Sequence, residues 1–208
     1  MDRGDIGAAA RSGDVGTMSR TMKARLAAAT CAAALTVAGG ALASAPAQGS
    51  TGAAAAGTAC ATDWGSGAKS APTMSWSQIT NARAGRHACY DRFVVDLRGT
   101  LRGYDVRYAP VYTEGQGKRV WLKGGADLRV IVRGPAYDSR GRATYNPRSK
   151  LNAVDVTGFR TFRQIAFAGS FEGQSTFGVG TRARLPMRVF IIKTTGGSRL
   201  VVDVAHTW

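Results

Sequence analysis

Apolar and charged residues alternate along the segment from Tyr90 to Gly99. Phe93, Val95 and Leu97 fall on one side of an extended chain, and charged side chains fall on the other. This period of two predicts a strand that buries one face, and the glycine is expected to end it.

The same pattern returns at the end of the chain, in Ser198–His206. When Arg92 is aligned with Arg199, both copies read Arg, an apolar residue, Val, Val, Asp. We interpret the copies as the first and last long strands of one β domain, built as variants of a single unit. The alternative is a chance match, because any short amphipathic strand can produce such a pattern.

Between the two copies, further alternating segments are separated by glycine-rich turns. A tight hairpin is expected at 194–197, and a long, mostly polar surface connection at 134–161. From residue 48 onward, no apolar period of 3.6 residues persists for three turns. The chain therefore predicts an all-β fold, either a sandwich or a barrel, in a single domain spanning residues 60–208.

The segment before this domain has the layout of an exported protein. Residues 1–21 lack apolar periodicity. They are interpreted either as residues upstream of the true translation start or as a disordered tail. Residues 22–47 contain a short basic region, an uncharged Ala-rich run and then small residues, which is typical of a signal peptide. A retained membrane anchor is the alternative, but the run is short and weakly hydrophobic, so no stable membrane span is expected in the mature chain. Residues 48–62 are interpreted as a flexible lead-in.

Two cysteines remain once the signal peptide, which ends at residue 47, is removed: Cys60 and Cys89. An even pair in an exported protein predicts a disulfide, which ties the lead-in to the start of the first long strand. A catalytic thiol is the competing interpretation, and it would need an activating base.

The residues that usually perform catalysis are sparse. The only histidines are His87 and His206, and the only glutamates are Glu114 and Glu172. Neither a zinc ligand set nor a facing pair of carboxylates is indicated. We therefore predict no metal, no cofactor, no catalytic residue and no enzymatic activity. The segment 178–180 lacks the third glycine of a dinucleotide loop and is interpreted as a bulged or tightly packed strand.

Charge is the strongest functional signal. The chain has 28 Lys and Arg against 13 Asp and Glu, and removing the five bases and three acids before Gln48 leaves a net charge of +13. One interpretation is a solubilising surface whose arginines reflect codon bias. The other is attraction to a polyanion, because guanidinium groups bind carboxylates and phosphates with two hydrogen bonds. Export makes nucleic acid the second choice as the polyanion.

Aromatic residues near these arginines suggest stacking on sugar rings. The alternative for Trp64 is packing against the neighbouring disulfide. The candidate arginines are those in segments expected to be strands, where the arginine side chains lie on the face opposite the apolar one. The candidate ligand-binding residues are Trp64, Tyr90, Arg92, Arg98, Arg107, Arg182 and Arg184.

A set of short motifs resembles the AMIN-like domain of secreted actinobacterial proteins, over about Cys60 to Trp208. The motifs are the segments 64–66, 86–92, 103–108, 171–173, 177–180 and 201–206. The resemblance relates the chain to the AMIN domain of cell-wall amidases, which is a β-sandwich of two similar halves that binds peptidoglycan. It implies a sandwich here too, and it supplies no catalytic residue.

Together, these observations predict an exported, non-enzymatic binding module at the cell wall, with peptidoglycan or teichoic acid as its anionic polymer. A cell-wall enzyme is a further candidate partner. The alternative is a cell-wall hydrolase with an unrecognised carboxylate site.

Overall fold

The computed structural model describes residues 60 and 62–208, and these form an all-β domain. No helix able to cross a membrane occurs within this part of the chain. The predicted start, the signal peptide and most of the lead-in lie outside the described residues. The strands are β1 (Lys69–Pro72), β2 (Gln78–Arg86), β3 (Tyr90–Arg98), β4 (Gly103–Tyr108), β5 (Val111–Tyr112), β6 (Arg119–Val120), β7 (Ala126–Val132), β8 (Phe162–Phe171), β9 (Gln174–Thr181), β10 (Met187–Thr194) and β11 (Gly197–Ala205).

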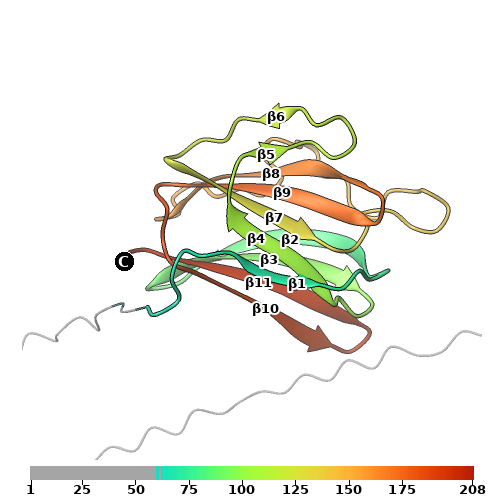
Figure 1. Cartoon of the computed structure of the whole chain (residues 1–208), viewed down its shortest axis with the longest axis horizontal. Helices are drawn as coiled ribbons and strands as arrows, with labels where there is room; N and C mark the ends of the chain where they lie inside the picture. Colours follow the sequence, from blue (N-terminus) through green and yellow to red (C-terminus); the bar gives the residue numbers. More distant parts are fainter. Residues whose placement is uncertain (1–59, 61) are drawn as a thin grey trace, which may run out of the picture. The chain divides into compact units, whose positions relative to one another are not determined.

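Two antiparallel sheets face each other, which confirms the predicted sandwich (Figure 1). One sheet has five strands in the order β1-β4-β7-β9-β8, and the other has four in the order β10-β11-β3-β2. The predicted hairpin joins β10 to β11 through Thr195 and Gly196, and Gly196 has the positive φ that such a tight turn requires.

The strand order has the pattern expected of two similar halves. Each sheet contains two antiparallel pairs, β2-β3 with β10-β11, and β4-β7 with β8-β9. In every pair the second strand lies in the interior of its sheet and pairs with the second strand of the other pair. Strand β1 is added at the edge beside β4.

The core lies between the sheets and is built from the apolar side of each alternating strand. Phe93, Val95 and Leu97 of β3 are buried, as their spacing predicted. The rings of Phe93 and Phe177, from opposite sheets, meet edge to face at a centroid distance of 5.3 Å.

The two copies of the repeated pattern are neighbouring strands, β3 and β11, and pair antiparallel. In this register, Arg92 lies opposite Asp203 and Asp96 lies opposite Arg199. A segment with Arg at one end and Asp at the other is complementary to its own copy when the two run in opposite directions. Cross-strand pairs of opposite charge stabilise a sheet, which gives the repeat a physical reason.

A third layer, residues 109–125 with the small sheet β5-β6, covers the outer side of the five-stranded sheet (Figure 1). Val111 and Val120 pack there on Ala166 and Ala168 of β8. A Cβ on Gly180 would lie 2.1 Å from the backbone oxygen of Lys123. The interpretation of residues 178–180 as a tightly packed strand is therefore confirmed.

The connection 133–161 contains no named strand, as expected, but it is more than a surface excursion. Ala136 and Val156 are buried, and the Tyr145 ring lies 5.1 Å from that of Phe167. The connection therefore contributes to the core.

The predicted disulfide is present between Cys60 and Cys89, whose Cα atoms are 5.2 Å apart. The thiols are thus joined and neither is a free nucleophile.

Candidate functional site

The outer face of the four-stranded sheet carries most of its charge in ordered rows across the strands. Each row contains one residue from β2, β3, β11 and β10, because these strands are aligned in register. The three rows are Gly85–Arg92–Asp203–Arg188, Arg83–Val94–Val201–Phe190 and Asn81–Asp96–Arg199–Ile192.

The first row contains a carboxylate shared by two arginines. Arg92 donates two hydrogen bonds to Asp203, from Nε at 2.7 Å and from Nη2 at 2.9 Å. Arg188 donates a third from Nε, at 2.8 Å. The Asp203 side chain is completely buried. A buried carboxylate is stable only when it is paired, and here one negative charge holds two positive ones.

Three aromatic rings surround the guanidinium of Arg188. Its central carbon lies 4.4 Å from the ring centroid of Trp64, 5.3 Å from that of Tyr90 and 5.5 Å from that of Phe190. Arg92 lies over the last two rings at 5.3 and 5.6 Å. Such contacts are attractive and restrict the rotamers of both side chains. We call Trp64, Tyr90, Arg92, Arg188 and Phe190, with Asp203 beneath them, the arginine–aromatic cluster.

The cluster presents a fixed positive charge to solvent. The hydrogen bonds that Arg92 donates to Asp203 raise the pKa of its guanidinium, so it stays charged. The Arg188 side chain is 41% exposed, and its terminal nitrogens make no hydrogen bond with the described residues. The cluster therefore has a net charge of +1 and an accessible guanidinium end that suits a carboxylate or phosphate oxygen.

Asp96, in the third row, is shared in the same way by Arg83 and Arg199, at 2.8 and 3.2 Å. No aromatic ring lies over these two guanidinium groups among the described residues. This second triad repeats the charge of the cluster without its aromatic frame.

Three of the predicted site residues are brought together in the cluster: Trp64, Tyr90 and Arg92. Trp64 packs edge to face on Tyr90 at 5.6 Å and against Arg188. The sequence predicted that Trp64 stacks on a sugar or packs on the disulfide, and did not predict this contact of its ring with Arg188. Arg98 is on the same outer face but at the other end of β3.

Three predicted arginines lie elsewhere. Arg107 is on the outer face of the five-stranded sheet, paired with Asp105. Arg182 and Arg184 were expected on a strand, and this was wrong: they lie in the connection between β9 and β10. There Arg182 bonds the backbone oxygen of His206, and Arg184 bonds Ser66 at 3.1 Å and lies over the Tyr108 ring. Their spacing of two mimicked a strand, because alternation alone does not distinguish a strand from an extended connection.

The sequence-based selection missed Arg188 and Phe190. Both alternate with the apolar residues of segment 187–192, so the sequence indicates that their side chains point away from the core. The sequence does not indicate their proximity to Tyr90, because this proximity depends on β10 lying beside β11 in the sheet.

A second buried aspartate has a structural role. Asp91 is fully buried; one oxygen accepts hydrogen bonds from the backbone nitrogens of Thr161 and Phe162 at 2.6 and 3.1 Å, and the other lies 3.1 Å from Nε2 of His206. The other ring nitrogen of His206 lies 3.2 Å from the Ala88 oxygen. These contacts join the start of β3, the end of β11 and the start of β8.

Within residues 60 and 62–208, no group of three or more His, Cys, Asp or Glu side chains is placed to hold a metal ion.

The AMIN-like domain model matches residues 77–206. Searches of curated proteins and of solved structures find no significant match. The matched segment covers both sheets except β1, including the paired strands β3 and β11, the buried Asp91–His206 pair and all members of the cluster except Trp64. The chain belongs to the AMIN-like domain family.

Proposed function

We propose that this domain is an exported, non-enzymatic module that binds an anionic cell-wall polymer, peptidoglycan or teichoic acid, through the arginine–aromatic cluster. The observation that carries the proposal is Arg188, held by Asp203 and three rings with its outer end exposed. Its rotamer is restricted before any ligand arrives, so little conformational entropy is lost on binding.

Membership of the AMIN-like family favours a cell-wall-related binding role in general. The disulfide fits an extracellular or cell-wall location, because disulfides persist in oxidising surroundings.

The use of the aspartates supports a non-enzymatic role. Of the eight aspartates in the described part of the chain, six contact an arginine or histidine side chain, and these contacts occupy their carboxylates structurally. The six are Asp91, Asp96, Asp105, Asp127, Asp138 and Asp203. A hydrolase needs a carboxylate free to accept or donate a proton at the substrate.

The purified protein is expected to cosediment with isolated cell walls at low salt, and binding should fall steeply between about 0.1 and 1 M salt. The screening length shortens over this range from about 10 Å to about 3 Å, which removes long-range attraction. A smaller fraction should remain at high salt, since aromatic contacts are not screened. The measurement is the bound fraction against salt concentration.

The same samples distinguish the enzymatic alternative. The supernatants should contain no more soluble muropeptide than walls incubated without protein. Release that grows with time would contradict the non-enzymatic role, and absence of cosedimentation at low salt would contradict wall binding.

A further inference from the structure

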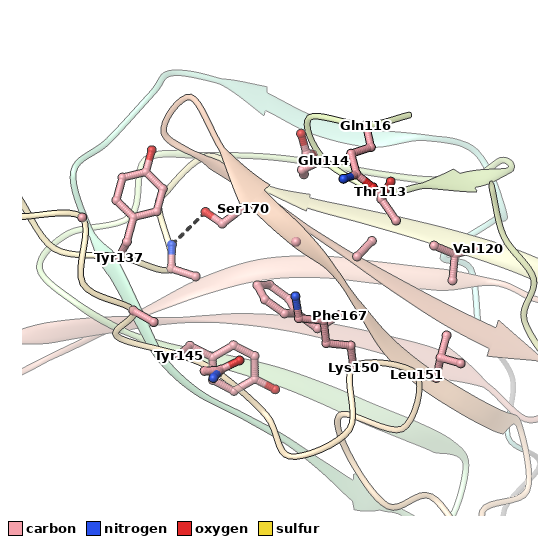
Figure 2. Close-up of a pocket in the computed structure, with 16 residues that line it drawn as sticks. Thr113, Glu114, Gln116, Val120, Tyr137, Tyr145, Lys150, Leu151, Phe167 and Ser170 are labelled. Atoms are coloured by element: carbon pink, nitrogen blue, oxygen red, sulfur yellow. Dashed lines mark hydrogen bonds between the residues drawn. The ribbon is translucent and has the colours of Figure 1, made fainter. Parts of the chain in front are cut away.

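Loops at the end of the sandwich remote from the cluster enclose three adjoining depressions. The largest has a volume of 520 Å³ and lies between the connection 136–151, β8 and the turn that joins β5 to β6. Figure 2 shows Tyr137 and Tyr145 on one side of it, Thr113, Glu114 and Gln116 on the other, and Phe167 and Ser170 of β8 between them.

The other two depressions follow in series, each sharing lining residues with the one before it. The second, of 260 Å³, shares Tyr137 with the first and is closed by Trp76 and by the β8-β9 turn at Glu172 and Gly173. The third, of 410 Å³, shares Trp76 with the second and extends to Arg102. We call this series, from Lys150 to Arg102, the end groove.

Trp76 lies between the second and third depressions, exposed on a loop that hydrogen bonds hold in place. It is 80% exposed, whereas its neighbour Ser77 is buried. Ser75 bonds the Arg133 oxygen through both its backbone nitrogen, at 3.1 Å, and its hydroxyl, at 2.9 Å. The loop is therefore fixed while the indole faces solvent, so its flat face is available for stacking on a ligand.

Tyr137 supplies a second aromatic ring that a hydrogen bond holds in place. Its hydroxyl accepts a hydrogen bond from the backbone nitrogen of Gly173 at 2.9 Å, which places the ring between the first and second depressions. The Gln116 and Asn146 amides and the Lys150 amine, which line the first depression, make no side-chain hydrogen bond within the described part of the chain. Stacking rings with free amide and amine groups between them suit a ligand whose flat faces alternate with hydroxyl edges.

The charge of the end groove differs from that of the domain. The charged residues that line it are Glu114, Lys150, Glu172 and Arg102, which sum to zero. Both glutamates of the sequence lie here, in a chain with a net charge of +15. A polyanion would gain nothing from this lining, so the groove favours an uncharged ligand.

Glu172 is held at a conformational cost. Its φ is 48°, and it is the only described residue other than glycine with a positive φ. Two-residue turns of this kind favour Gly or Asn at this position, so the carboxylate occupies a position where either of these residues would be more stable.

We propose that the end groove binds an uncharged linear polysaccharide, with one sugar ring against Trp76 and another against Tyr137. This inference rests on the proposed function and deepens it: the cluster binds the anionic groups of the wall polymer and the end groove binds a glycan chain. Affinity should therefore increase with the number of linked sugars and should not depend on salt.

The test is titration of the purified protein with uncharged oligosaccharides of one to six sugars, from the chitin, cellulose and amylose series, followed by calorimetry at 0.1 and 1 M salt. At least one series should bind more tightly with length, equally at both salt concentrations. W76A should weaken binding roughly tenfold or more, because it removes a whole stacking surface. W121A is the matched control: Trp121 is 78% exposed but does not line the groove, and its loss should leave affinity unchanged.

A second variant separates binding from folding. E172G should weaken binding while keeping or raising the melting temperature, because glycine adopts this φ without strain. The inference is overturned if no oligosaccharide binds, or if W76A binds as tightly as W121A. Cosedimentation with walls at low salt would survive that result, whereas failure of the proposed function would remove the salt-sensitive part of cosedimentation and leave oligosaccharide binding intact.

Discussion

Replacing Asp91 by alanine is expected to lower the free energy of unfolding by about 2–6 kcal/mol, the cost of leaving two buried backbone donors unsatisfied at about 1–3 kcal/mol each. The change leaves two backbone nitrogens, of Thr161 and Phe162, without an acceptor in the interior. It also removes the carboxylate that His206 contacts. Unsatisfied buried donors keep their full desolvation cost, so the effect exceeds that of a lost surface contact.

Urea unfolding followed by tryptophan fluorescence measures this effect. D63A is the control, because Asp63 is exposed and makes no ion pair or hydrogen bond with other described residues. Its unfolding midpoint should match that of the parent. A D91A midpoint equal to that of D63A would show that Asp91 does not hold the three strand ends together.

Replacing Gly180 by alanine should lower the free energy of unfolding by about 3 kcal/mol, at the upper end of the usual cost of overpacking. The new methyl would lie 2.1 Å from the Lys123 oxygen, a backbone atom that cannot rotate away. The layer 109–125 must therefore move outward from β9, and Val111 and Leu122 lose their packing against the sheet.

G67A is the matched control, because a Cβ at Gly67 meets no atom within 4 Å and its φ is not positive. It should keep the parent stability or slightly increase it. Trypsin should cleave G180A faster than the parent after Lys118 or Lys123. Unchanged stability together with unchanged cleavage would contradict the close contact between the layer and the sheet.

The strands were largely predictable because alternation is a local property. Tyr90–Gly99 was expected as a strand, and β3 occupies Tyr90–Arg98. The hairpin between β10 and β11 was equally local, since its glycines mark it. The same local signal failed at Arg182 and Arg184, where alternating residues occupy an extended connection.

Strand neighbours were not predictable, and the site depends on them. Asp203 joins Arg92 to Arg188 only because β11 lies between β3 and β10. The sequence showed an arginine-rich face but not that each aspartate on it neutralises one arginine of a pair. The end groove was hidden for the same reason: Trp76, Tyr137 and Glu172 come from three loops far apart in the chain.

The central claim is that Arg188 in its aromatic frame contacts the wall polymer, and cosedimentation of R188A and R83A with cell walls tests it most directly. Each variant removes one positive charge from the same face of the sheet. In R188A, Asp203 keeps its ion pair with Arg92, and in R83A, Asp96 keeps its ion pair with Arg199. R188A should bind roughly tenfold more weakly than the parent at about 0.1 M salt, the loss expected for one charge-assisted contact. R83A should stay within about threefold, because it alters only the screened long-range attraction. Equal binding by R188A and the parent, or equal losses in both variants, would contradict the claim.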